Sequence, residues 1–278
     1  MYLTIDGVRV PRFLYGTAWK EEATEGLTLL ALRQGFRGID TANQQHYHEA
    51  GVGTGIAAAL KAKIVIREEL FLQTKFTFLA GQDQRLPYDP KAPVATQVRQ
   101  SVARSLEHLG VDRLDSLVLH GPSIRAGLAA ADREAWLAME TAHDEGLARL
   151  LGVSNVTLEQ LDRFCQQARI PPRFVQNRCY ASQGWDRAVR AYCAKNGLVY
   201  QGFSLLTANR ELFRHAAIQR IAKRHAKDMV QILFRFALDV GMIPLTGTTK
   251  ANHMSADLEV FDFSLSKDEV EIVDRVLG

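Results

Sequence analysis

The chain has 278 residues, 47% hydrophobic and 23% charged, which is the composition of an ordinary soluble globular protein and excludes extensive disorder. The net charge is +3, and basic residues alternate with acidic ones, so nothing indicates binding to nucleic acid. No apolar stretch approaches the ~20 residues that cross a bilayer, the N-terminus lacks a signal-peptide pattern, and three cysteines without CxxC spacing argue against a disulfide framework. We therefore expect a cytoplasmic protein.

Residues 1–13 alternate and turn like a β-hairpin, and the remaining chain alternates short apolar runs with longer stretches of helical period. This alternation predicts repeated strand–helix units. Strands are expected near residues 13–16, 37–40, 70–75, 114–120, 148–154, 173–177, 198–203 and 241–246. Helices are expected near residues 23–34, 48–61, 94–108, 131–145, 157–168, 185–195, 228–240, 253–258 and 266–276.

Eight strands, each followed by a helix, predict the α/β fold of a (β/α)8 TIM barrel, because open doubly wound sheets more often use five or six strands. We expect one barrel domain over residues 1–278, preceded by the N-terminal β-hairpin. No GxGxxG motif follows the first strand. GVGTG at 51–55 falls within a predicted helix, which argues against a phosphate-binding loop.

Two connections are longer than usual. Residues 76–93 are polar and rich in Pro and Gly, and they directly follow the third barrel strand. A loop of this length at the C-terminal face of a barrel is often functional, so we expect it to form a wall of the pocket. Residues 204–227 follow the seventh strand and include a helical stretch whose basic face is expected to be solvated, with contact to a cofactor phosphate as the alternative.

Four ionisable residues lie at or just beyond the ends of predicted strands: Asp40, Tyr47, Lys75 and His120. The C-terminal ends of the strands build the active site of a parallel barrel, so these four residues can converge on one pocket. Their separation along the chain is then no obstacle to a common role.

These residue types suit proton transfer to a developing alkoxide. A tyrosine has an unperturbed pKa of ~10, and a nearby ammonium such as Lys75 stabilises its phenolate. Asp40 would hold that lysine charged, and His120 can hydrogen-bond a substrate oxygen. The set holds no nucleophile or metal, so the electrons must come from elsewhere, most simply as a hydride from nicotinamide.

Several motifs, in order, resemble those of the aldo-keto reductase family. GIDTANQQHYHEAGVG resembles that family's Asp-Thr-Ala followed by Tyr and Asn-Glu-x-x-Val-Gly. The family's Lys, His and Gly-Val-Ser-Asn motifs are matched, in order, by QTKF, LVLHGP and LLGVSN. FVQN, YQGFSLL, IPLTGTT and EVFDFSLSKDEV resemble its later strands, turn and closing helix, so the resemblance spans nearly the whole chain.

The resemblance implies a monomer that binds NADPH first and then reduces a small aldehyde or ketone. It implies Tyr47 as the general acid, with Lys75 and Asp40 tuning it and His120 orienting the carbonyl. Phe203 would stack on the nicotinamide ring. The implied cofactor-binding residues are Gly16, Thr17, Ser154, Asn155, Gln176, Phe203, Ser204, Leu206, Thr246, Thr248, Lys250, His253 and Asp257. Within that set, Ser154, Asn155 and Gln176 would hydrogen-bond the nicotinamide carboxamide.

The loop that carries Tyr47 departs from the family pattern. The family usually has Tyr five residues after its Asp, where this chain has Gln45. A loop lengthened by one residue would keep Tyr47 in the pocket. In the alternative, Tyr47 faces away and His46 or His48 takes part instead.

A second departure concerns the adenosine 2′-phosphate of the cofactor. Leu245 and Thr246 replace the family's Lys-Ser pair, but Lys250 or His253 can still meet the phosphate. NADPH is therefore favoured over NADH. The chain also ends soon after its closing helix, so we expect an open substrate pocket walled by residues 76–93, Trp19 and Tyr180.

Two other functions are compatible with the residues. A barrel that senses NADP(H) with slow turnover would explain the altered Tyr47 loop. A metal-dependent hydrolase or isomerase would use His46 and His48, but no third ligand accompanies that pair, so no metal is expected.

Overall fold

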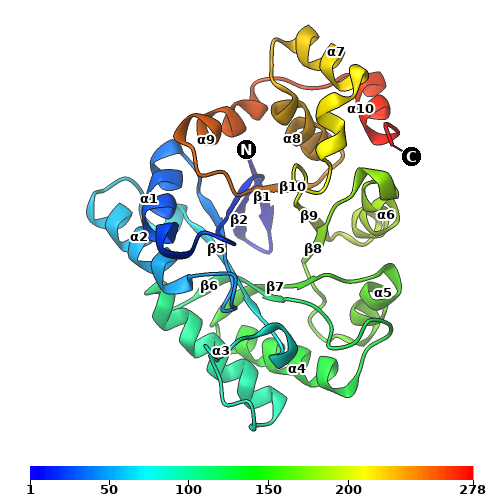
Figure 1. Ribbon diagram of the computed structural model, residues 1–278. Helices are drawn as coiled ribbons and strands as arrows, with labels where there is room; N and C mark the ends of the chain where they lie inside the picture. The colour runs from blue at the N-terminus through cyan, green and yellow to red at the C-terminus, as the bar shows by residue number, and fades with distance from the viewer. Residues whose placement is uncertain (278) are drawn as a thin grey trace.

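The computed structural model describes residues 1–277 and confirms the predicted (β/α)8 barrel. Its strands close in the order β10-β3-β4-β5-β6-β7-β8-β9, with every neighbouring pair parallel. Figure 1 shows these strands inside a ring of helices. They are β3 (Leu14–Gly16), β4 (Gly38–Asp40), β5 (Phe71–Phe76), β6 (Leu114–Leu119), β7 (Ala148–Ser154), β8 (Phe174–Arg178), β9 (Val199–Phe203) and β10 (Ile243–Thr246).

Each predicted helix is present within two residues of its expected bounds. The α-helices are α1 (Thr24–Gln34), α2 (Glu49–Lys61), α3 (Val94–Leu109), α4 (Ala130–Asp144), α5 (Leu158–Gln167), α6 (Arg187–Asn196), α7 (Ala216–His225), α8 (Met229–Asp239), α9 (Ala251–Leu258) and α10 (Lys267–Asp274). Short 3-10 helices are η1 (Glu21–Ala23), η2 (Arg67–Glu69), η3 (Leu79–Gly81), η4 (Ala181–Asp186), η5 (Arg210–Arg214) and η6 (Glu259–Phe261).

Helix α6 begins two residues later than the sequence pattern predicts. Trp185 and Asp186 have φ values of 56° and 55°, which a right-handed helix excludes. The Trp185 side chain is fully buried, and its indole nitrogen donates to the backbone oxygen of Val273 at 3.0 Å. Burial of Trp185 and its hydrogen bond to the C-terminal helix α10 therefore set the start of α6.

An N-terminal hairpin closes one end of the barrel. Strands β1 (Tyr2–Ile5) and β2 (Val8–Pro11) pair antiparallel, and they lie across the centre of the ring in Figure 1. Val8 and Val10 pack in one buried cluster with Leu14, Phe71 and other residues near the N-terminal ends of the barrel strands. The closed end is thus apolar and dry, and a ligand has to enter from the C-terminal ends of the strands.

The glycines of GVGTG are packing residues within α2, as their helical position suggested. A side chain at Gly53 would overlap the backbone oxygen of His108 at the end of α3. A Cβ at Gly55 would lie 2.7 Å from the backbone oxygen of Glu25 in α1. These glycines let α2 approach both neighbouring helices closely.

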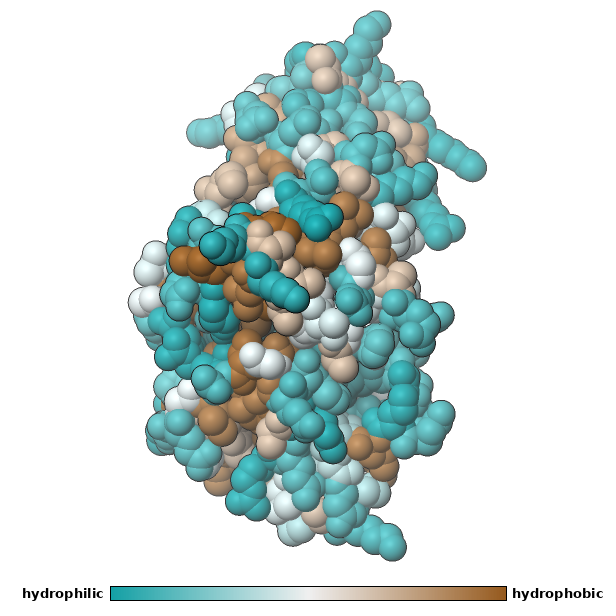
Figure 2. Space-filling view, turned by 90° about the vertical axis from the view of Figure 1, so that its left-hand side faces the viewer, coloured by the Kyte–Doolittle hydropathy of each residue, from teal (hydrophilic) through white to brown (hydrophobic). Residues whose placement is uncertain are grey.

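The outer surface is largely hydrophilic. Figure 2 views the side on which α1 and α2 lie in Figure 1, and it shows hydrophobic side chains gathered in a band between hydrophilic ones. Within residues 1–277, no helix is long and apolar enough to span a membrane.

We predict that Gly53→Ala destabilises the protein by about 2 kcal/mol or more, because the added methyl group has to displace backbone rather than a flexible side chain. Gly26→Ala is the matched control, since Gly26 is an exposed residue of α1 with nothing within 4 Å of an added Cβ. That variant should gain roughly 0.5 kcal/mol from helix propensity. Urea unfolding of both variants measures the difference, and equal stabilities would contradict the packing role of Gly53.

Candidate functional site

The barrel interior is layered, and the layers follow from strand alternation. Successive inward residues of β5 are Phe71, Gln73 and Lys75, since side chains of a strand alternate between its two faces. Phe71 belongs to the apolar layer above the hairpin. The polar residues Gln73 and Lys75 lie in the next layers toward the open end. The site therefore lies inside the barrel, near the C-terminal ends of its strands.

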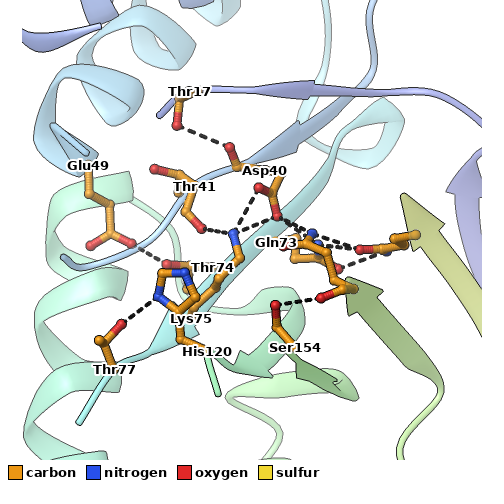
Figure 3. A network of polar contacts seen from close by, with 12 residues as sticks. Thr17, Asp40, Thr41, Glu49, Gln73, Thr74, Lys75, Thr77, His120 and Ser154 are labelled. Carbon is orange, nitrogen blue, oxygen red and sulfur yellow. Dashed lines mark hydrogen bonds and ion pairs between the residues drawn. The ribbon is translucent and has the colours of Figure 1, made fainter. Parts of the chain in front are cut away.

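At the centre of the site, Lys75 and Asp40 form a buried ion pair (Figure 3). The Lys75 Nζ lies 2.8 Å from both carboxylate oxygens of Asp40 and donates a third hydrogen bond to the backbone oxygen of Thr41 at 2.8 Å. The two side chains are 0% and 4% exposed. All three protons of the ammonium are therefore directed toward oxygen within the fold.

Two glutamines contact the Asp40 carboxylate and a third glutamine contacts both of them, and the sequence analysis assigned none of the three to Asp40. Gln73 and Gln176 donate from Nε2 to the Asp40 Oδ1 at 2.7 and 2.9 Å. Gln201 accepts from both glutamines, at 2.8 and 2.9 Å, and donates back to Gln73 at 3.1 Å. A carboxylate only accepts hydrogen bonds, so Asp40 fixes which way these amides point.

A signal for these glutamines was present in the sequence. Gln73 precedes Lys75 by two residues in an otherwise apolar strand, which puts both side chains on one face. Gln201 holds the equivalent inward position in β9, where it pairs with Gln176 of β8 in the strand register. A buried polar residue on the inward face needs a partner, which is Asp40 for Gln73 and the other two glutamines for Gln201.

The lengthened loop keeps Tyr47 beside the ion pair. A turn before Tyr47 is closed by a hydrogen bond from the Tyr47 backbone N–H to the Gln44 backbone oxygen at 2.9 Å. The centre of the Tyr47 ring lies 5.2 Å from the Lys75 Nζ and 6.1 Å from the centre of the His120 ring. Tyr47 and His120 both line the same cavity.

Residues 76–93 were expected to form a pocket wall, but they do not line this cavity. They pack instead behind the Tyr47 loop and hold its backbone. Gln82 donates to the backbone oxygen of Asn43 at 2.9 Å, and Arg85 donates to that of Gln45 at 2.5 Å. Gln44 in turn donates to the backbone oxygen of Gly81 at 2.7 Å.

The neighbouring histidines lie to the side of the site. His46 stacks on Trp19 with ring centres 3.7 Å apart and an interplanar angle of 25°. His48 is the residue at which α2 begins. Neither histidine is among the residues that line the cavity with Tyr47. Among residues 1–277 there is also no group of three or more His, Cys, Asp or Glu side chains that could hold a metal ion.

His120 is half-buried and is held by two hydrogen bonds. Its backbone N–H donates to the backbone oxygen of Phe76 at 2.9 Å. Its imidazole Nδ1 forms a 2.7 Å hydrogen bond with the Thr77 hydroxyl. Burial, together with the nearby Lys75 ammonium and the neighbouring His46 side chain, lowers the pKa of His120 to about 3. The imidazole is therefore neutral at ordinary pH.

The environment of the site keeps the Tyr47 phenol neutral and the Lys75 side chain charged. Burial raises the pKa of Tyr47, and the Lys75 ammonium only partly opposes this effect. Burial alone would lower the pKa of Lys75, but the charge and hydrogen bonds of Asp40, together with Tyr47 and Glu49, outweigh it, so this pKa is raised. Glu49 acts in the same direction and is hydrogen-bonded to Thr74 behind the lysine (Figure 3).

A cavity of about 700 Å³ extends from Tyr47 and His120 toward α9. Most of the predicted site residues line it. They are Gly16, Trp19, Asp40, Tyr47, His120, Ser154, Gln176, Phe203, Ser204, Leu206, Thr246, Thr248, His253 and Asp257. The arrangement brings together residues from the first to the last barrel strand.

Four predicted contact residues lie elsewhere. Thr17 is buried and donates from both N and Oγ1 to the Asp40 backbone oxygen at 3.0 Å. Asn155 donates to the His120 backbone oxygen at 2.7 Å and lines a second cavity of about 570 Å³, as does Tyr180. Lys250 is exposed just before α9 and is not on the wall of the main cavity.

Lys20 is a further cavity residue that the sequence analysis missed. It is 8% exposed, and its Nζ donates to the backbone oxygen of Gly247 at 2.6 Å. Burial lowers its pKa to about 8. No carboxylate among residues 1–277 pairs with it, so a buried cation on the cavity wall is left without a counter-ion.

Comparison with known proteins identifies the family. A sequence model described as the aldo/keto reductase family matches residues 15–277. The chain belongs to the aldo/keto reductase family. It is accordingly an NAD(P)H-dependent oxidoreductase, as the motifs indicated.

Relatives match over nearly their full length. The uncharacterized oxidoreductase YtbE of Bacillus subtilis is 30% identical over 273 residues, covering 98% of this chain and 90% of the relative. The putative methylglyoxal reductase DkgA of Salmonella typhi is 31% identical over 270 residues, covering 95% and 89%. The crystal structure of the Bombyx mori aldo-keto reductase AKR2E4 in complex with NADP has a TM-score of 0.84 and 26% identity, covering 99% and 92%.

We predict that Gln73 and Gln201 are energetically coupled through their reciprocal hydrogen bonds. Gln73→Leu and Gln201→Leu should each cost roughly 2 kcal/mol, because each leaves buried polar groups without a partner. The double variant should cost about 1 kcal/mol less than the sum, since it removes both partners together. Urea unfolding of the four proteins measures this cycle, and additive effects would show that the glutamines act independently.

Proposed function

We propose that this protein reduces aldehydes or ketones to alcohols, with NADPH as the hydride donor. The observation that carries the proposal is the buried Asp40–Lys75 ion pair next to Tyr47, at the base of a cavity open to solvent. A carbonyl oxygen that becomes an alkoxide needs a proton, and the Tyr47 phenol beside this ion pair is placed to deliver it.

The cavity suits a nicotinamide cofactor in size and chemistry. Its volume of about 700 Å³ falls within the ~300–1,000 Å³ typical of ligand sites. The half-buried ring of Phe203 supplies a face for the nicotinamide. The unpaired Lys20 ammonium and the N-terminus of α9 favour phosphate groups, since both direct positive charge at the cavity. When bound, NADPH supplies the hydride.

The residues around Tyr47 then act on the proton. The Tyr47 phenol gives its proton to the substrate oxygen as charge develops there, and the Lys75 ammonium stabilises the phenolate that remains. Asp40 keeps that lysine in place and charged. We assign the ring proton of neutral His120 to Nε2, with Nδ1 accepting from the Thr77 hydroxyl, so that Nε2–H donates a hydrogen bond to the same oxygen.

Relatives support both the cofactor and the substrate class. The Bombyx mori enzyme was solved with NADP, and one relative is named as a methylglyoxal reductase, which points to small aldehydes. Exposed Lys250 and His253 flank the start of α9, and they favour NADPH over NADH as partners for its extra phosphate. No contact within residues 1–277 favours the sensing role or the metal-dependent reaction.

We predict that Tyr47→Phe lowers kcat for aldehyde reduction by about 10²- to 10⁴-fold, the usual contribution of a general acid. The affinity for NADPH should stay within about twofold, because the phenylalanine ring retains the apolar contacts of the tyrosine. Steady-state kinetics and a fluorescence titration with NADPH measure the two quantities.

His46→Ala is the control for the histidine alternative. His46 stacks on Trp19 and does not line the cavity, so its loss should change kcat by no more than a few-fold. A Tyr47→Phe enzyme that retains its rate, together with an inactive His46→Ala enzyme, would transfer the role to His46.

We predict no histidine inflection in the pH dependence of kcat. His120 has a pKa of about 3, so it stays neutral as pH falls through the ordinary value of 6.5. Tyr47 has a raised pKa and keeps its proton as pH rises. The profile for reduction should therefore be level between about pH 5 and about pH 8.

This profile should be measured for kcat at saturating NADPH with an uncharged aldehyde. Lys20 and Asp257 line the cofactor end of the cavity with pKa values of about 8 and about 7, so their titration affects cofactor binding rather than the chemical step. A fall in kcat below pH 6.5 that persists in His46→Gln and His253→Gln variants would contradict a neutral His120.

A further inference from the structure

Arg178 is directed at the mouth of the catalytic cavity. It is the last residue of β8 and follows Gln176 by two positions, so both side chains leave the strand on its inward face. Gln176 reaches the Asp40 carboxylate, and Arg178 stands about 7 Å nearer the open end, the rise of two strand residues. The side chain between them, Asn177, points outward to Asp186.

The contacts of Arg178 place it between two cavities. It lines the main cavity with Tyr47 and His120, and it also lines the second cavity with Tyr180. Its guanidinium carbon lies 5.8 Å from the centre of the Tyr180 ring. This cation–π contact favours the position of the guanidinium but leaves its charge uncompensated. Because Arg178 shares the main cavity with Tyr47 and His120 and is the register partner of Phe203, we assign the guanidinium to the end of the cavity where the carbonyl is reduced.

Arg178 has no carboxylate partner among residues 1–277, although many other arginines of this chain do. Two examples are Arg173 with Asp6 and Arg187 with Asp274, both at 2.7 Å. An exposed arginine at the rim of a cavity, left free while others are paired, is available to a ligand.

Arg178 carries the uncompensated charge at the substrate end of the main cavity. Asp40 and Lys75 cancel each other, and Tyr47 and His120 are neutral. The remaining acidic residues of the main cavity are engaged at its other end. Asp228 caps α8 through the Gln231 N–H at 2.8 Å, and Asp257 accepts from the Thr246 hydroxyl at 2.7 Å. The substrate end is thus net positive, which attracts anions.

We propose that Arg178 is a specificity-determining residue that binds a carboxylate on the substrate, so that the preferred substrates are aldehydes or ketones carrying a carboxylate group. This inference rests on the proposed reductase function and names its substrate class. The planar guanidinium can donate two parallel hydrogen bonds to a carboxylate. These charge-assisted bonds are stronger than those it can donate to a neutral group of the substrate. The carboxylate is unchanged in the reaction: hydride from NADPH adds to the carbonyl carbon, and the oxygen takes the proton of Tyr47.

Matched pairs of acid and ester test the proposal. Terephthalaldehydic acid and its methyl ester present the same aromatic aldehyde with and without the negative charge, and succinic semialdehyde and its methyl ester form a flexible pair. We expect kcat/KM of the wild-type enzyme to be about tenfold or more higher for each acid than for its ester. This preference should shrink as NaCl is added, because the guanidinium is exposed.

Variants at two arginines then assign the effect. Arg178→Gln should lower kcat/KM for the acids by about 10- to 100-fold, mainly through KM, and leave the esters within about twofold. Arg178→Lys should recover part of the loss, since it restores charge but not the fork. Arg125→Gln is the control, because Arg125 is also exposed and unpaired within residues 1–277 but lines only the second cavity.

Binding measurements separate substrate from cofactor. The affinity for NADPH should be the same in the Arg178→Gln and wild-type proteins. The hydroxymethyl benzoate product should bind the NADP-loaded wild-type protein at least about tenfold more tightly than the variant by calorimetry. Equal losses for acid and ester, or a weakened affinity for NADPH, would assign Arg178 to the cofactor or the fold and overturn the proposal.

Two results distinguish this inference from the function beneath it. A wild-type enzyme that reduces esters and acids equally well overturns the role of Arg178 and leaves the reductase function standing. A wild-type enzyme that oxidises NADPH with none of the four aldehydes overturns the reductase function itself.

Discussion

The ion pair between Asp40 and Lys75 is the interaction on which the rest of the site depends. Removing two charges from water costs several kcal/mol per ion, so such a pair persists only where further hydrogen bonds compensate. Here the compensation comes from Gln73, Gln176 and the Thr41 backbone. The barrel supplies these groups because β4 and β5 are adjacent strands in which Asp40 and Gln73 are register partners.

Two other parts of the fold, the N-terminal hairpin and the segment 76–93, shape the cavity next to this ion pair. The N-terminal hairpin seals the opposite end with Val8 and Val10, which leaves one entrance for ligands. The segment 76–93 holds the backbone of the Tyr47 loop through its contacts with Asn43 and Gln45. A long loop after a barrel strand therefore serves here to position a side chain rather than to wall the pocket.

The cavity has a different electrostatic character at each end. A buried ammonium, Lys20, and the start of α9 lie toward the cofactor end, where phosphate groups are suited. Neutral Tyr47 and His120 lie at the substrate end beside the free guanidinium of Arg178. Each end of the cavity thus has its own cation, which is the basis of the proposal that a dinucleotide and an anionic carbonyl compound bind there together.

The sequence by itself determined the fold and the identity of most site residues. Alternation of apolar runs and helical periods fixes a (β/α)8 barrel, and strand ends of such a barrel converge, so Asp40, Lys75 and His120 could be grouped from local patterns alone. The side-chain period of two also aligned Gln73 with Lys75 in one strand.

Only the tertiary structure decided which of these groups touch. Gln201 meets Gln73 across the barrel although 128 residues separate them, and the shear of the closed sheet, invisible in any single strand, sets that contact. The lengthened loop could have turned Tyr47 in or out, and its turn together with the distant segment 76–93 directed it toward Lys75. Long-range packing thus fixed the loops, because their own sequences encode turns but not the surfaces against which the turns rest.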